Sequence, residues 1–350
     1  MKRSCARAPV RVDPAGGGTD APPFSVEHGG LVVNIAVQRH AFASVDRLPT
    51  GSGIIISALD LRSTLTADSV KTLRGRNLEF LQAFVRRLVP EKDSLLLVTE
   101  SDVPPGAGLG GSGALGVAVV AAIDHAYGRA RSAMETAAIA NEVERKDLGY
   151  PGGDQDSYGA ALGGINRLEY IKGGKMIPHK IDITEDLRLT LEHNLLLIYT
   201  SEAHVSGNIH QDIKESYALE NSPVVDAMTH LREAARKMAR ALESSALTDF
   251  VDAMNESCTN LYRIHPSCDC EGHRRYMKEL GDLILGGKTC GAGGGGFLLV
   301  YAKPGRRREC IFKAERMGAR VWPVNIDFDG VRAWGAEPTP SADLERYRQS

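Results

Sequence analysis

Between residues 103 and 115 the chain carries a glycine-rich loop, VPPGAGLGGSGAL, which lies between two apolar runs. The preceding run, Leu95 to Val98, predicts a buried strand, and the following run, Ala114 to Ala126, predicts a helix. The glycines therefore lie where a loop opens into a helix N-terminus, whose free N–H groups and positive dipole attract anions. Because glycine has no Cβ, the backbone can also approach a ligand closely. The stretch predicts a phosphate-binding loop.

Two known phosphate loops differ from this one. A Walker A loop ends in Gly-Lys-Ser/Thr, whereas the end of this loop, Gly111-Ser112-Gly113, has no lysine. The dinucleotide fingerprint G-x-G-x-x-G matches Gly106, Gly108 and Gly111, but it needs a second strand that ends in an acidic residue. A second helical pattern, 132–147, follows here instead. A dinucleotide site and a glycine turn without a ligand remain the alternatives.

Composition excludes several other classes of protein. The chain has 350 residues, a formal net charge of −2 and a charged fraction of 25%. This balance predicts neither nucleic-acid binding nor attachment to a membrane surface. The N-terminal segment, residues 1–7, is not followed by the apolar core of a secretory signal, and the six cysteines form no disulfide framework. We expect a cytoplasmic protein.

Glycine clusters recur at residues 16–18, 149–164 and 286–296. Strands are expected at 31–37, 44–45, 54–57, 165–170, 195–200 and 297–301, with those near 44–57 in an antiparallel sheet. Helices are expected at 78–88, 132–147, 224–242, 247–263, 272–283 and 306–317. A change in pattern near 177–187 divides the chain into domains 1–185 and 186–340, with a tail at 341–350.

Three motifs, in this order, resemble those of the GHMP kinases. The first is residues 8–20, APVRVDPAGGGTD; the second is the loop 104–115; the third is residues 291–297, GAGGGGF. The form Gly-Gly-Gly-Thr-Asp is similar to that of bacterial heptose-phosphate kinases, and Thr-Asp-Ala-Pro-Pro at 19–23 is similar to the Thr-Asp-Thr-Pro-Pro of fucokinases. The resemblance spans about residues 5 to 335.

The resemblance implies an α+β fold of two domains, a ribosomal-S5-like N-terminal domain and a ferredoxin-like C-terminal domain, with the active site between them. It implies ATP as phosphoryl donor and Mg²⁺ as its counter-ion. The implied activity is sugar phosphorylation, best matched by a D-glycero-D-manno-heptose 7-phosphate 1-kinase. An L-fucose-like or other hexose 1-kinase is the alternative, and a non-catalytic binding relative is the alternative of a different class. We expect a monomer or homodimer with a small-molecule sugar or sugar-phosphate partner.

The resemblance also assigns roles to residues. Asp156 would be the catalytic carboxylate, with Asp154 as the competing position, and Arg11 would neutralise charge on the transferred phosphoryl group. Ser112 and Glu144 would bind magnesium. The substrate-binding residues would be Asp13, Gly17, Gly18, Thr19, Asp20, Gln155 and His204. The ATP-binding residues would be Pro105, Gly106, Ala107, Gly108, Leu109, Gly110, Gly111, Ser112, Gly113, Gly293 and Gly294.

Each of these assignments has an ordinary structural alternative. Asp20 could cap a turn, Arg11 could be a strand-edge residue, and Glu144 could be a helix-surface charge. Heptose-phosphate kinases usually have an arginine near His204, so a histidine there weakens the case for a phosphorylated substrate unless another cation serves. The cluster at 265–273, HPSCDCEGH, has residues that bind zinc, but Cys-x-Cys is not the usual finger spacing.

Overall fold

The computed structural model describes residues 3–75, 77–200, 206–218, 223–340, 344, 346 and 347. Within them the larger of two sheets has eight strands, in the order β12-β1-β2-β5-β3-β4, with β6 beside β2 and β7 beside β6. The strands are β1 (Arg3–Ala15), β2 (Gly30–Leu48), β3 (Ile54–Ala58), β4 (Ser63–Ala67), β5 (Ser94–Ser101), β6 (Ile165–Tyr170), β7 (Met176–Lys180) and β12 (Arg332–Ala336).

The long strand β2 organises this sheet, because its two halves have different neighbours. Its first half, Gly30 to Ile35, pairs with β6, whereas its second half, Ala41 to Leu48, pairs with β5. All pairings are antiparallel except that of β3 with β5, which is parallel. The expectation of antiparallel strands near residues 54–57 holds for β3 with β4 but not for β3 with β5. The strand β4 returns the chain to the end where β3 starts, and the segment that contains α2 then crosses to the other side of β3, where β5 starts at that same end.

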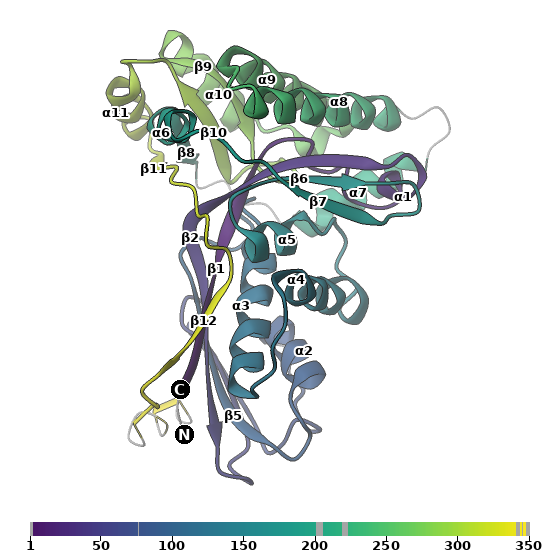
Figure 1. Ribbon diagram of the computed structural model, residues 1–350, viewed down its shortest axis with the longest axis vertical. Coiled ribbons are helices and arrows are strands. Elements are labelled where there is room, and N and C mark those ends of the chain that lie inside the picture. Colours follow the sequence, from purple (N-terminus) through teal and green to yellow (C-terminus); the bar gives the residue numbers. More distant parts are fainter. Residues whose placement is uncertain are drawn as a thin grey trace.

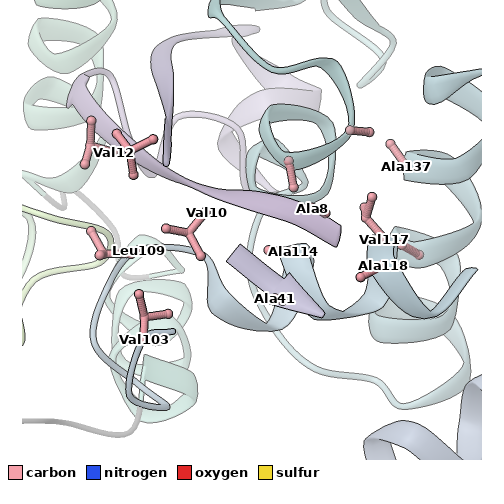
Figure 2. Close-up of a cluster of buried hydrophobic side chains, with 14 of the residues drawn as sticks. Ala8, Val10, Val12, Ala41, Val103, Leu109, Ala114, Val117, Ala118 and Ala137 are labelled. Atoms are coloured by element: carbon pink, nitrogen blue, oxygen red, sulfur yellow. The ribbon is translucent and has the colours of Figure 1, made fainter. Parts of the chain in front are cut away.

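Helices cover one face of the larger sheet, with α3 in the centre (Figure 1). The helices of this part are α1 (Phe24–Glu27), α2 (Glu79–Leu88), α3 (Gly111–Ala126), α4 (Ala133–Glu142), the π-turn η1 (Val143–Asp147) and α5 (Gln155–Leu162). The side of α3 that contacts the sheet is formed by small residues such as Ala114 and Ala118, which belong to one buried cluster with Ala8 and Val10 of β1 (Figure 2). Small side chains allow close packing, so the glycine loop is fixed against the sheet.

The smaller sheet contains four strands among the described residues, in the antiparallel order β11-β8-β10-β9. They are β8 (Leu195–Tyr199), β9 (Ile284–Thr289), β10 (Phe297–Ala302) and β11 (Arg320–Pro323). Its helices are α6 (Glu185–Asn194), α7 (Ser206–Tyr217), α8 (Val224–Glu243), α9 (Leu247–Ile264), η2 (Pro266–Cys268), α10 (Glu271–Leu280), η3 (Gly281–Leu283) and α11 (Arg307–Arg316). The helices α8 and α9 pack on each other, α9 contacts β9 of the smaller sheet, and α8 contacts β2 of the larger one.

The expected helices at 224–242, 247–263, 272–283 and 306–317 are confirmed within a few residues as α8, α9, α10 with η3, and α11. Gly286 and Gly287, part of a glycine cluster for which we predicted no helix or strand, lie inside β9, where Gly287 pairs with Val300. The strand β12 returns to the larger sheet and pairs with β1, so this strand does not share a sheet with the rest of the expected second domain. The boundary at 185 stays a prediction. In the described part of the chain, no helix combines the length and the apolar character that crossing a membrane requires.

Candidate active site

The glycine loop leads directly into α3. Gly106, Gly108 and Gly110 have φ angles of 71°, 83° and 69°, a conformation that side chains with a Cβ rarely adopt. Gly110 caps the helix, which begins at Gly111, and its first turn has no acidic side chain. No carboxylate of the first turn therefore neutralises the positive end of the helix dipole, which leaves that end able to attract an anion.

Beside this loop, Arg11 of β1 forms a partly buried ion pair with Asp156 of α5. The Arg11 Nε and Nη2 atoms lie 2.8 and 2.5 Å from Oδ1 of Asp156, and Nη1 donates to the carbonyl of Gly108 at 2.6 Å. Burial lowers the pKa of Arg11, but the carboxylates of Asp156 and Asp13 more than offset this and raise it. The guanidinium is thus a fixed positive charge that joins the carboxylate to the glycine loop.

The position of Asp156 explains why residue 113 is glycine. A Cβ on Gly113 would lie 2.5 Å from the Cβ of Asp156 and 2.8 Å from its carbonyl carbon. Real Cβ atoms do not approach so closely, so a side chain here would displace α5 from α3. The close contact between the two helices keeps Asp156 at the mouth of the glycine loop.

A pocket of about 460 Å³ lies next to this pair, between α1, η1, the loop 150–154 and α7. Gly18, Asp20, Asp154 and His210 are among its lining residues. Asp20 accepts hydrogen bonds from the backbone N–H of Gly18 at 3.1 Å and of Gln155 at 3.2 Å. Burial, followed by the charges of Asp154 and Asp156, raises the pKa of Asp20 to about 7. The pocket therefore has a wall of carboxyl groups, which suits the recognition of hydroxyl groups.

At the N-terminus of α3, the Ser112 hydroxyl donates to Oε1 of Glu144 at 2.9 Å. Glu144 is 5% exposed, and burial raises its pKa, although Arg145 at 3.7 Å opposes this shift. No group of three or more His, Cys, Asp or Glu that could hold a metal lies in the part that the structure describes. Magnesium, however, commonly uses one or two protein oxygens together with substrate phosphates and water. The hydroxyl and carboxylate of this pair are hard oxygen donors and fit that pattern.

A second buried ion pair joins the two sheets behind the glycine loop. The Lys288 Nζ atom of β9 lies 3.1 Å from Oδ2 of Asp13, and both side chains are at most 1% exposed. The other oxygen of Asp13 accepts the backbone N–H of Gly291 at 2.9 Å. Phe297, at the start of β10, donates its backbone N–H to the carbonyl of Ala107 at 3.1 Å. The loop 291–296 therefore packs against the back of the glycine loop.

Comparison with known proteins agrees with this geometry. Residues 77–164, which include the glycine loop and Asp156, match the model of the GHMP kinases N-terminal domain. This chain carries a GHMP kinase N-terminal domain. The expected family, the α+β fold and the phosphotransferase class that uses an alcohol group as acceptor are confirmed with it.

Similarity to curated proteins and solved structures extends over nearly the whole length of this chain. It is 28% identical over 95% of its length to a D-glycero-alpha-D-manno-heptose 7-phosphate kinase of Campylobacter jejuni, of which it covers 99%. A crystal structure of a D-glycero-D-manno-heptose 1-phosphate kinase from Bacteroides thetaiotaomicron matches it with a TM-score of 0.79 at 25% identity, covering 95% of this chain and 98% of that one. A bifunctional fucokinase/GDP-fucose pyrophosphorylase of Arabidopsis thaliana is 26% identical over 86% of this chain, which spans 30% of that protein.

Several of the predicted site residues lie together at the pocket, and others lie behind its wall. Gly18 and Asp20 line the pocket, whereas Asp13, Gly17 and Thr19 do not. Thr19 is fully buried, and its hydroxyl bonds to backbone groups of Gly16 and Leu31. A Cβ on Gly17 would lie 1.8 Å from the Asp13 carboxylate. These residues support the pocket, and their direct contact with substrate stays a prediction.

The other predicted site residues lie in the loop 291–296, in the cluster 265–273 or outside the described residues. The N–H of Gly294 donates to the carbonyl of Cys268 at 2.9 Å, so it is already used within the protein. Direct contact of Gly293 and Gly294 with ATP therefore also stays a prediction. His204 lies outside the described residues. The zinc interpretation of 265–273 is not supported, because no candidate metal group is found among the residues that the structure describes.

Some residues of the site were missed in the sequence. Lys288 lies in β9, where we predicted no strand, so nothing in its local pattern indicated a buried charge. Tyr170, at the end of β6, donates its hydroxyl to Asp154 inside the pocket. Lys214 and Tyr217 line the pocket from α7, a helix that we did not expect. Helical spacing between His210, Lys214 and Tyr217 was the available signal.

Proposed function

We propose that this chain transfers the γ-phosphoryl group of ATP to the anomeric hydroxyl of a sugar, and that the sugar is D-glycero-D-manno-heptose 7-phosphate. The Arg11–Asp156 ion pair beside the glycine loop is the observation that carries the proposal of phosphoryl transfer. The similarity to a heptose 7-phosphate kinase over nearly the whole of both chains supports this sugar.

In this proposal Asp156 accepts the proton of the acceptor hydroxyl. Both contacts from Arg11 fall on Oδ1 of Asp156, and no hydrogen bond or ion pair within the described residues involves Oδ2. The Asp156 side chain keeps 20% of its surface exposed, and in this proposal Oδ2 is the oxygen that accepts the hydroxyl proton. The Asp156 charge acts on the pKa of both Asp20 and His210, which line that pocket.

Arg11 has the complementary role of a permanent charge. Because a guanidinium does not lose its proton at working pH, it offsets negative charge that develops on the phosphoryl oxygens. Its contact with the Gly108 carbonyl fixes it relative to the loop that would hold the ATP phosphates. Positioning and charge stabilisation are what phosphoryl transfer requires most from a protein.

The family also implies magnesium, and the Ser112–Glu144 pair fits it. These two side chains would supply one hydroxyl and one carboxylate oxygen, both at the end of the loop that faces the phosphates. When bound, the ion neutralises charge on the ATP phosphates. We expect the magnesium requirement to depend on both residues.

The deciding experiment measures ADP release from Mg·ATP over a panel of sugars that contains heptose 7-phosphate, mannose, fucose, galactose and mevalonate. We expect turnover with heptose 7-phosphate and expect Asp156→Asn to lower kcat at least about a hundredfold while ATP still binds. Asp154→Asn is the matched control, because it removes the same charge two residues away. If Asp154→Asn is inactive and Asp156→Asn is not, the catalytic assignment is wrong.

Turnover with fucose alone would favour the alternative, an L-fucose-like hexose 1-kinase. The similarity to the fucokinase relative over 86% of this chain is the observation that keeps this alternative. Turnover with no member of the panel, under conditions in which Mg·ATP binds, would contradict the proposed function.

A further inference from the structure

One wall of the pocket is formed by a single stripe of α7. His210, Ile213, Lys214 and Tyr217 all line the pocket, and their spacing of three and four residues places them on one face of the helix. Two contacts fix the rotation of α7 about its axis. Ile209 and Ile213 are buried in a cluster with Phe24, and the hydroxyl of Tyr217 donates to Glu27 at 2.6 Å.

Most of the charged side chains that line the pocket already have hydrogen-bond partners within the protein. Its carboxylates, Asp20 and Asp154, are on the walls opposite α7, and each already accepts hydrogen bonds. Of its two cations, Arg145 donates from Nε and both terminal nitrogens to the carbonyls of Tyr150, Pro151 and Gly153. The guanidinium therefore holds the loop 150–153 in place and is not free to bind a ligand.

Lys214, the second cation, differs from Arg145 in this respect. The structure gives its ammonium group no ion pair or hydrogen bond with any described residue, although it lines the pocket. A lysine ammonium has three donors and a mobile stem, so it can follow an anion that enters the pocket. Within the described lining, Lys214 is the cation that remains for a negatively charged ligand.

The position of Lys214 along α7 suggests which part of the ligand it meets. His210, one turn earlier, lines the pocket together with Asp20 and Asp154, and Asp154 lies two residues before Asp156 in the chain. Burial, followed by Arg145, lowers the pKa of His210 to about 4, so the imidazole is uncharged at neutral pH. One helical turn rises by about 5–6 Å, close to the length of a sugar ring. A sugar with its acceptor hydroxyl at Asp156 would place its opposite end near Lys214.

We propose that Lys214 binds the phosphate at the end of the sugar opposite the acceptor hydroxyl, and that it thereby selects phosphorylated over free sugars. This inference rests on the proposed function and names the residue that would give it its preference for a sugar phosphate. A phosphate dianion in the pocket would be repelled by the carboxyl groups of Asp154 and Asp20 wherever these are ionised, while the Arg145 guanidinium is engaged with backbone carbonyls. The ammonium group compensates for that repulsion by a charge-assisted hydrogen bond.

The test compares kcat/KM for heptose 7-phosphate with that for the same heptose without phosphate. Lys214→Met keeps the apolar stem and removes the charge, Lys214→Arg restores the charge, and Lys237→Met of α8 serves as control because its ammonium pairs with Glu256 outside the pocket. We expect Lys214→Met to lower kcat/KM for the 7-phosphate about tenfold to a hundredfold, mainly through KM, and to leave the free sugar within about twofold. Lys214→Arg should recover most of the loss.

Added salt gives a second readout that a structural role would not affect. The KM of the wild type for the 7-phosphate should rise with ionic strength, and that of Lys214→Met should rise less. Equal losses for both sugars, or no loss for the 7-phosphate, would overturn the role of Lys214. Turnover of free sugars alone by the wild type would overturn it as well and leave the kinase assignment intact. If the wild type turns over no sugar, the proposed function fails. Calorimetry tests Lys214 independently of turnover: equal affinity of the wild type and Lys214→Met for the 7-phosphate would overturn the role of Lys214.

Discussion

Replacing Asp20 by asparagine should change how the stability of this protein depends on pH. In the folded chain Asp20 has a pKa of about 7, raised first by burial and then by Asp154 and Asp156. In the unfolded chain its pKa returns to about 3.9. The folded state therefore holds a proton that the unfolded state has lost across the window from about pH 4 to pH 7, so the free energy of unfolding falls as pH rises through that window.

The size of this effect follows from the two pKa values. Between pH 5 and pH 8 the ionisation of Asp20 alone should lower the free energy of unfolding by about 2.5 kcal/mol. An asparagine side chain at this position would keep an oxygen that accepts the N–H of Gly18 or Gln155 but could not ionise. Asp20→Asn should therefore lose about 2.5 kcal/mol less stability between these pH values than the wild type.

Urea denaturation at pH 5 and pH 8, without ligands, measures the difference. Burial also raises the pKa of Asp154 and Glu144, so the variant should keep a smaller fall of the same sign. Asp60→Asn, which alters an exposed carboxylate between β3 and β4, is the control and should behave as the wild type does. An identical fall in wild type and Asp20→Asn would refute the argument that Asp20 holds its proton near neutral pH.

Two further predictions concern the packing behind the glycine loop. Lys288→Met removes the nearer cation of the buried Asp13 carboxylate and leaves only Arg11, at 3.9 Å, so the free energy of unfolding in urea should drop by up to about 3–5 kcal/mol. A drop below about 1 kcal/mol would show that the pair is not isolated from water. Gly113→Ala would place a Cβ 2.5 Å from that of Asp156 and so displace the Arg11–Asp156 pair. We therefore expect kcat to fall about tenfold or more. An unchanged kcat in a folded variant would contradict that geometry.

The sequence predicted the local features of the fold well and the contacts between distant residues poorly. Apolar periodicity identified α8 and α9, and the order strand, glycine loop, helix around residue 111 was confirmed, because each is encoded in consecutive residues. Position 37 bridges to position 326, and no local pattern could have indicated such a pairing.

The candidate site shows the same limit. The motif around residues 8–20 correctly directed attention to Asp20, which lines the pocket. It did not reveal that Asp13 faces away from the pocket toward Lys288, because the partner is 275 residues away in the chain. The β9 sequence, with Gly286 and Gly287, has no strand pattern of its own, and it is pairing with β10 that makes it a strand. Tertiary contacts thus decided which polar residues line the pocket and which support it.

The return of β12 to the edge of β1 has a consequence for how this chain is made. As the protein leaves the ribosome, β1 and β2 emerge early, yet the register of Cys5 with Trp334 cannot form until nearly all of the sequence has followed. During that time one side of β1 exposes unpaired backbone groups, and the nascent sheet is open to pairing with other chains. Because β12, the last of the described strands, completes the β1 edge of the larger sheet, this sheet can finish folding only late in synthesis.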